Sequence, residues 1–140
     1  MNRLCGKISH LTTSGNTTLV DVDVKGSQIT AVTIGIPEKA GYLQISKNIE
    51  LLFNESEVSI GKLIQGHISL INQLNCIIDN LISGEIFTQV MLSFNEEHLT
   101  SLITTRSAER LNLKIGDNVT AFIKTNEVLL KEPDGPWNAD

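Results

Sequence analysis

The chain has 140 residues, of which 41% are hydrophobic and 19% are charged, and its formal net charge is −5 with a pI near 5.1. This balance is typical of a folded, soluble protein, because enough apolar side chains are present to form a core. The acidic charge argues against a nucleic-acid surface, which would show clustered Lys and Arg. We therefore expect no nucleic-acid partner.

The beginning of the chain and its cysteines exclude further classes of protein. No apolar run approaches the roughly 20 residues of a membrane span, and the first residues lack the apolar stretch of a signal peptide. Cys5 and Cys76 form no CxxC motif, and the three histidines lack the spacing of metal ligands. We therefore expect a cytoplasmic protein with buried thiols, without a membrane partner, a cation site or a cofactor.

Along the chain, alternating apolar and polar residues predict half-buried strands. In the segment 18–24, Val20, Val22 and Val24 would share one face of such a strand. Turn signals recur at the spacing of an antiparallel barrel or sandwich. They lie at 13–16, 25–27, 82–85 and 115–118, and short helices are predicted near 37–43 and 106–113.

Three blocks of sequence occur twice in the same order, which predicts a tandem repeat. The segment 6–9 matches 66–69, 29–32 matches 99–102, and 45–58 matches 115–128. The offset is 60 residues for the first block (66 − 6) and 70 for the last (128 − 58). We therefore expect about ten extra residues in the second copy. They would lie at 72–81, as a longer β-hairpin or as an inserted turn of helix.

Each copy contains the strands and short helix of an OB-like barrel. The predicted fold is all-β, with two tandem OB-like five-stranded barrels that each carry one short helix. The first module would span 1–58 and the second 59–131. The tail 132–140 would be peripheral, because two prolines and a glycine within 133–136 cannot sustain a central strand.

The segment 104–124, TTRSAERLNLKIGDNVTAFIK, resembles the signature of the Mop, or TOBE, domain. That family's pattern is approximately T-x-x-S-A-x-x-L-x-L-x-x-G-x-x-V-x-A-x-I-K. The segment 63–68, LIQGHI, resembles the family's opening strand, N-x-L-x-G-x-V. The resemblance covers the second copy nearly end to end, and the first copy more weakly. Two such copies are similar to tandem di-Mop molybdate-binding proteins and to the ligand-sensing half of molybdate-responsive regulators.

The resemblance implies a protein that binds molybdate or tungstate in the cytoplasm for storage or homeostasis. The alternative is a regulatory module that senses the anion for a separate transcription factor or transport ATPase. No nucleophile, base and orienting group form a recognisable arrangement, so we expect no enzymatic activity. The family also implies a homo-oligomer of six modules with sites between neighbouring subunits. For a two-module chain this favours a trimer, and a dimer is the alternative.

In the family register, the ligand residues of the second copy are Thr104, Ser107, Ala108 and Lys124. Thr104 and Ser107 are three residues apart at the start of a helix, so their hydroxyls can face one point. Local pattern alone favours a plain N-cap, a surface serine and a solvated lysine. Their combination in the family register favours an oxyanion site, to which Lys124 would add a positive charge.

The resemblance adds a second ligand segment, the family's Ser-Ala-Arg-Asn, at 59–62. Here it consists of Ser59, Ile60, Gly61 and Lys62. Ser59 would contribute its hydroxyl. Gly61 replaces the arginine and offers only its backbone, so Lys62 would have to supply the charge.

The first copy lacks these ligand residues. Ile34, Pro37 and Asn54 stand where the second copy has Thr104, Ser107 and Lys124. Isoleucine has no hydroxyl and proline has no N–H donor, so the first copy cannot form the same pocket. We expect it to be a structural half that can still line a site.

Overall fold

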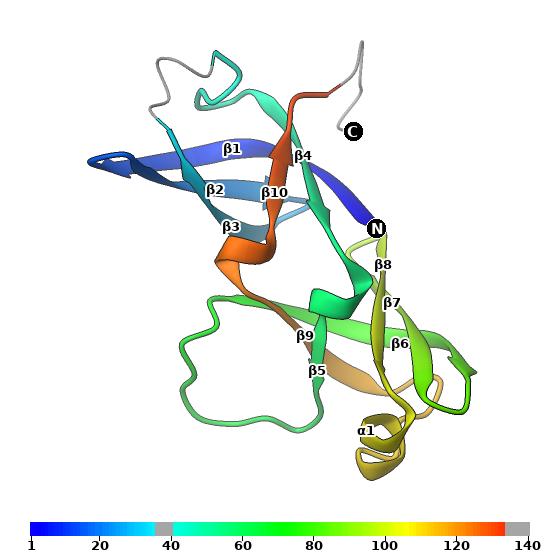
Figure 1. Cartoon of the computed structure of the whole chain (residues 1–140). Coiled ribbons are helices and arrows are strands. Elements are labelled where there is room, and N and C mark those ends of the chain that lie inside the picture. The colour runs from blue at the N-terminus through cyan, green and yellow to red at the C-terminus, as the bar shows by residue number, and fades with distance from the viewer. Residues whose placement is uncertain (36–40, 134–140) are drawn as a thin grey trace. The chain divides into compact units, whose positions relative to one another are not determined.

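The computed structural model describes residues 1–35 and 41–133, most of them in antiparallel strands (Figure 1). Within these residues no helix has the length and apolar character needed to cross a membrane. The strands are β1 (Asn2–Ser14), β2 (Thr17–Val24), β3 (Ser27–Ile34), β4 (Asn48–Phe53), β5 (Ser59–Gly61), β6 (Asn72–Ser83), β7 (Phe87–Phe94), β8 (Glu97–Thr104), β9 (Asn118–Ile123) and β10 (Leu129–Lys131). The helical elements are α1 (Thr105–Arg110) and the 3-10 turns η1 (Glu55–Glu57) and η2 (Thr125–Glu127).

These strands form two five-stranded sheets, with the orders β10-β4-β1-β2-β3 and β5-β9-β6-β7-β8. In each sheet the two edge strands come near each other, β10 to β3 and β5 to β8, so the sheet curls upon itself. Curling shields the edges and encloses one face. The predicted all-β fold with two five-stranded sheets is confirmed.

Each sheet buries its own core through the period-two alternation of its strands. Val20, Val22 and Val24 of β2 are fully buried, as the sequence predicts. In β7 the corresponding side chains are Val90 and Leu92, also fully buried. Burying one such side chain contributes about 1.5–3 kcal/mol, so these inward rows hold the sheets closed.

The compact units do not follow the chain in simple halves. One unit comprises Arg3–Phe53 together with the chain from Thr125 onward, and the other comprises Asn54–Lys124. The cause is that β5 pairs with β9 in the second sheet, whereas β10 returns to pair with β4 in the first (Figure 1). The modules 1–58 and 59–131 stay a prediction about the repeat along the chain, which differs from the units by this exchange.

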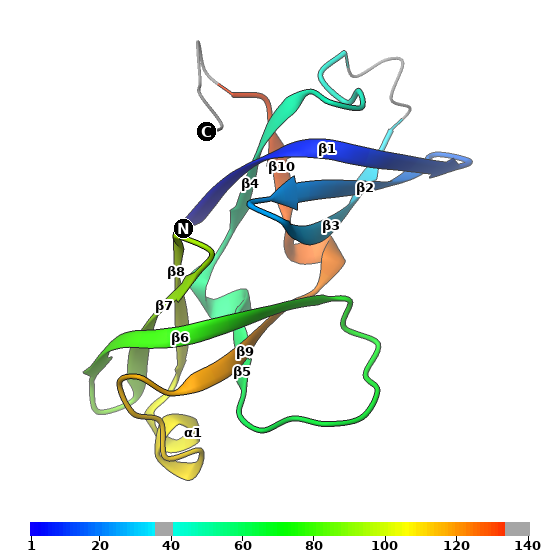
Figure 2. The same cartoon turned by 180° about the vertical axis from the view of Figure 1, so that it is seen from behind.

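The ten extra residues of the second copy do not lie at 72–81, so that prediction is wrong. Those residues belong to β6, which matches β1 at an offset of 70 (72 − 2), with a bulge after Ile8 in β1 and after Ile78 in β6. The extra residues form instead the loop 62–71 between β5 and β6, drawn in green in Figure 2. The match of Gly6 to Gly66 paired a glycine inside a strand with one at φ 100° in a loop.

The turns and the second helix lie where the sequence predicts them. Turns occur at Gly15–Asn16, Lys25–Gly26 and Ile115–Gly116, and α1 falls within the region predicted to be helical near 106–113. In the first copy, residues 36–40 of the helix predicted near 37–43 lie outside the described residues, as do residues 134–140 of the tail. Glu132 and Pro133 follow β10 without forming a strand.

Candidate anion-binding site

The start of α1 brings two of the predicted ligand residues together. Thr104 is the N-cap, with φ −68° and ψ 146°, and its Oγ1 accepts a hydrogen bond from the Ser107 amide at 3.1 Å. The Thr104 hydroxyl also donates to Ser107 Oγ at 2.9 Å. Ala108 is buried beneath this turn. Because Thr104 donates to Ser107, the proton of the Ser107 hydroxyl is left to donate elsewhere.

Thr105, which was not among the predicted site residues, fixes this turn to the β6–β7 hairpin. Its Oγ1 donates to the Gly84 carbonyl at 2.8 Å and lies 2.9 Å from Thr88 Oγ1. Its amide donates to the Ile86 carbonyl at 2.7 Å. The Thr-Thr pair at 104–105 was the signal in the sequence, since adjacent hydroxyls point to opposite sides. Thr104 caps the helix while Thr105 anchors it.

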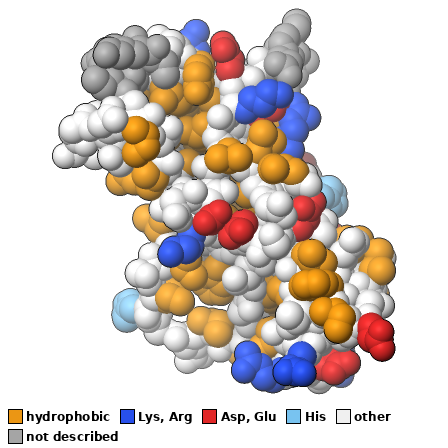
Figure 3. Space-filling view, in the orientation of Figure 1, with side chains coloured by type: hydrophobic (Ala, Val, Ile, Leu, Met, Phe, Trp, Pro, Cys, Tyr) orange, Lys and Arg blue, Asp and Glu red, His pale blue; other side chains and the backbone are white. Residues whose placement is uncertain are grey.

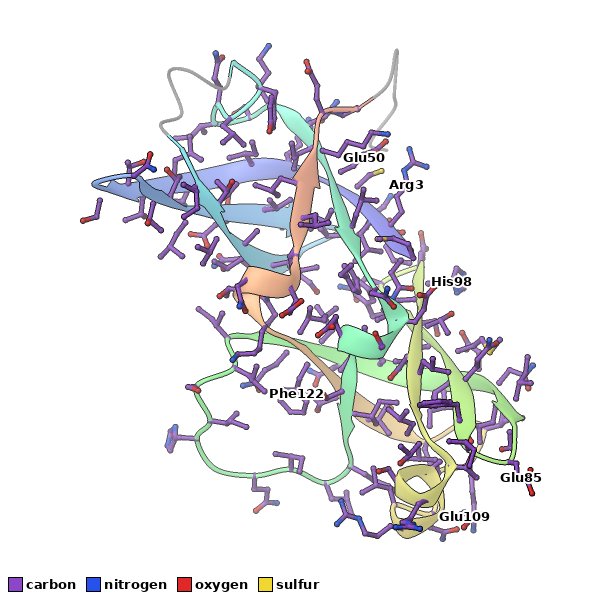
Figure 4. The ribbon with its side chains drawn as sticks, viewed as in Figure 1. Arg3, Glu50, Glu85, His98, Glu109 and Phe122 are labelled. Carbon is purple, nitrogen blue, oxygen red and sulfur yellow. The ribbon has the colours of Figure 1, made fainter. Side chains whose placement is uncertain are left out.

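A cavity of about 290 Å³ lies beside Thr104 and is lined by Glu85, Ile86 and Arg106 as well. Arg106 is exposed, and Lys and Arg side chains gather at the α1 end of the second unit (Figure 3). A guanidinium suits a tetrahedral oxyanion because its donors form a planar fork. Glu85, at the tip of the hairpin (Figure 4), opposes an anion here. Arg106 was missed because the family pattern has no fixed residue at its position.

Ser59 and Lys124 lie at a different end of the second sheet. Ser59 pairs with Phe122, and Lys124 directly follows β9, where Ile123 pairs with Asn72 at the start of β6. Both Ser59 and Lys124 are exposed. Thr104 pairs with Phe87, beside the far end of β6. At about 3.3 Å per residue, the 12-residue strand β6 separates the two groups by roughly 30 Å.

Between these two ends, Gly61 and Lys62 have packing and bridging contacts. A Cβ atom at buried Gly61 would lie 2.5 Å from Ile64 Cγ1 and 2.7 Å from Phe122 Cε2, so only glycine fits. Phe122 extends from β9 (Figure 4). Ile60, half-buried, pairs with Ala121.

The ammonium of Lys62 is held by the chain that follows α1. It donates to the carbonyls of Leu111 at 3.2 Å and Asn112 at 2.9 Å, and it forms an ion pair of 3.0 Å with Asp117. The hydrogen bond from Lys62, followed by that from the Lys114 amide, lowers the pKa of Asp117. Lys62 therefore fastens β5 to the segment that leads from α1 to β9.

The corrected strand register moves the family's serine. The pattern N-x-L-x-G fits Asn2, Leu4 and Gly6 at the start of β1, and N-x-L fits Asn72 and Leu74 at the start of β6. The Ser-Ala-Arg-Asn segment then ends at Asn72, which puts its serine at Ser69 rather than Ser59. Ser69 is exposed in the loop before β6, at the sheet end that also carries Lys124.

The cysteines are remote from α1. Cys76 is buried, and desolvation raises the pKa of its thiol to about 11, while Cys5 is half-buried. A thiol with so high a pKa is a poor nucleophile and a poor ligand at neutral pH. In residues 1–35 and 41–133, no three His, Cys, Asp or Glu side chains form a group that could hold a metal ion.

Comparisons with known proteins give one family match and two solved structures. The model of the TOBE domain family matches residues 68–130. The structure of the cytoplasmic molybdate-binding protein ModG, with molybdate bound, superposes with a TM-score of 0.88 at 23% identity, over 94% of this chain and 96% of that chain. A molybdate-binding protein from Sporomusa ovata is 29% identical over 42% of this chain and 88% of that one, with a TM-score of 0.41. The search of curated proteins gave no match.

Proposed function

Residues 68–130 of this chain are a TOBE domain, and from this premise we propose that the protein binds molybdate in the cytoplasm as a non-catalytic store or buffer. The observation that carries the proposal is the pair of joined hydroxyls, Thr104 and Ser107, held at the start of α1 inside that domain. Tungstate has the same tetrahedral geometry and charge and would bind at the same place. The likeness of the whole fold to a molybdate-bound protein supports this choice of ligand.

The α1 end offers donors that suit a dianion. The Ser107 hydroxyl donates without carrying charge, and the Arg106 guanidinium adds a charged fork beside Thr104. Each charge-assisted hydrogen bond contributes about 1.5–3 kcal/mol. A few such bonds give reversible binding, which a store requires.

The two groups of candidate residues favour a site shared by two copies of the chain. Thr104 and Ser107 lie about the length of β6 away from Lys124 and Ser69, so one unit does not bring them around a single small anion. A second copy that places its Lys124 end against the α1 end of the first would complete the donor set. This arrangement requires a homo-oligomer, for which we favour a trimer over a dimer. Ser59 lies at the same end as Lys124 and is the alternative serine.

The first copy has no equivalent donor group among its described residues. Ile34 is 70% exposed and has no hydroxyl, and the side chain of Asn54 already accepts from the Ser56 amide at 3.1 Å as the N-cap of η1. We therefore assign it a structural role in the assembly.

Calorimetric titration with molybdate tests this proposal on a double variant, Thr104→Val with Ser107→Ala. Loss of both hydroxyls should weaken binding at least about tenfold, because each hydrogen bond contributes about 1 kcal/mol or more. The control is Thr13→Val in the β1–β2 hairpin, whose hydroxyl lies 3.0 Å from Thr18 Oγ1, and it should bind normally. Native mass spectrometry of the same samples gives the oligomeric state. Unchanged affinity in a correctly assembled double variant would refute the site.

A further inference from the structure

The second unit has a larger cavity that contains none of the residues assigned to the oxyanion. Its volume is about 700 Å³, within the range of small-molecule sites. The first half of β6, the turn between β7 and β8, the start of β9 and the loop after β5 enclose it. Thr104, Ser107 and Lys124 all lie elsewhere.

The cavity occurs where the second copy differs from the first in strand packing. In β1 a Cβ atom at Gly6 would lie 2.4 Å from the Asp23 carbonyl oxygen and 2.7 Å from Val22 Cγ1. The counterpart of Gly6 in β6 is Cys76, 70 residues later, whose side chain needs that space. Strands β6 and β7 must therefore separate here, and Cys76 lines the cavity.

The lining combines an apolar wall with neutral polar groups and a carboxylate. Leu63, Ile64 and Ile77 form exposed apolar surface in it, at 88%, 57% and 47% exposure. Asn118 and Thr120 add amide and hydroxyl groups. Such a wall removes an apolar ligand body from water, while the polar groups orient it.

The charge of the cavity selects the sign of a ligand. Glu96 lines it, and none of the described residues around it is Lys or Arg. His98 extends from the start of β8 at the rim (Figure 4), where its Nδ1 lies 3.7 Å from Asp79 Oδ2. Two carboxylates at or near the opening, in a chain of net charge −5, disfavour anions and favour cations.

We propose that this cavity is a second ligand site, for an organic ammonium compound with an apolar body. The apolar part packs against Leu63, Ile64 and Ile77, and the ammonium group lies beside the Glu96 carboxylate. Molybdate is excluded, because no cation faces the cavity. The chain would then bind ligands of opposite charge at separate places.

The test is a titration of the full chain followed by amide NMR, with 2-phenylethylammonium as the probe. Phenylacetate, which has the same ring and the opposite charge, is the control ligand. The ammonium compound should shift amide signals of the cavity residues and saturate, whereas phenylacetate should not. Glu96→Gln should weaken the binding about three- to fivefold, as expected for an exposed ion pair. Glu97→Gln, the adjacent residue that does not line the cavity, should leave it unchanged.

Three results would overturn the proposal: equal binding of the two probes, amide shifts confined to other regions, or unchanged affinity in a folded Glu96→Gln variant. Ile77→Trp, at a half-exposed position, gives an independent check because it should fill the cavity and abolish binding. Molybdate titration of the Glu96→Gln variant should match the unchanged protein. This separates the cavity from the proposed oxyanion site.

Discussion

The two units have the same strand order but differ at matched positions 70 residues apart. The first unit has close backbone packing at Gly6 and a buried ion pair between Arg3 and Glu50. The second has Cys76 at the position of Gly6, and neutral Gln73 and Thr120 in place of the ion pair. One topology therefore supports a tightly packed copy and a copy with cavities and clustered hydroxyls. The following substitutions test whether this difference is real.

The largest effect should come from Gly6→Ala. The new Cβ atom would meet the Asp23 carbonyl oxygen, which cannot move away without disturbing the β1–β2 pairing. We expect the free energy of unfolding to fall by about 2–4 kcal/mol. Gly41→Ala, with no atom within 4 Å of its Cβ position, is the matched control and should change it by less than about 0.5 kcal/mol. Urea unfolding measures both, and equal stability of the two variants would contradict the close packing.

The next effect separates the two copies by ligand binding. Lys124→Ala in the second copy should weaken molybdate binding by about 1.5–3 kcal/mol, or roughly ten- to a hundredfold, because a charged donor is lost. Asn54→Ala, at the matched position of the first copy, should have little effect on affinity. Calorimetry with the oligomeric state checked in each variant distinguishes them. Equal losses from both substitutions would mean that the copies do not differ as proposed.

Arg3→Ala tests the ion pair that only the first unit has. Glu50 is 3% exposed, and Arg3 Nη2 lies 2.5 Å from its carboxylate (Figure 4). Removing the arginine leaves the buried carboxylate poorly compensated and should cost about 2 kcal/mol. Gln73→Ala, the matched change in the second unit, should cost about 0.5 kcal/mol, since that side chain is exposed. Thermal unfolding compares the variants, and a larger loss for Gln73→Ala would reverse the comparison.

The smallest effect concerns the pKa of Asp117, which Lys62 lowers in the second unit only, since the first has Lys47 at this position. A depressed pKa stabilises the fold above the unfolded-state pKa, and this stabilisation is lost as the pH falls through the folded-state value. In Lys62→Met the pKa of Asp117 should return toward its usual range, and the acid side of the stability profile should flatten. NMR titration of the Asp117 carboxyl measures this. Lys114→Met, which removes a weaker influence, should raise the pKa less.

The sequence alone determined the fold class and the α1 half of the candidate site. The alternation through Val20, Val22 and Val24 predicts a half-buried strand because a strand turns successive side chains to opposite faces. The spacing of Thr104 and Ser107 predicts their contact because a helix start brings residues three apart together. Both are local properties, so they depend on chain geometry more than on distant partners.

Tertiary structure alone decided the repeat register, the exchange of β5 and β10, and the separation of Lys124 from Thr104. Gly66 and Gly6 are alike as letters, but only strand pairing distinguishes a loop glycine from one packed against Asp23. Lys124 is 20 residues from Thr104 in sequence, yet the pairing of β9 with the start of β6 carries it to the far end of the sheet. Such placement depends on hydrogen bonds between strands distant in sequence, which no local pattern encodes.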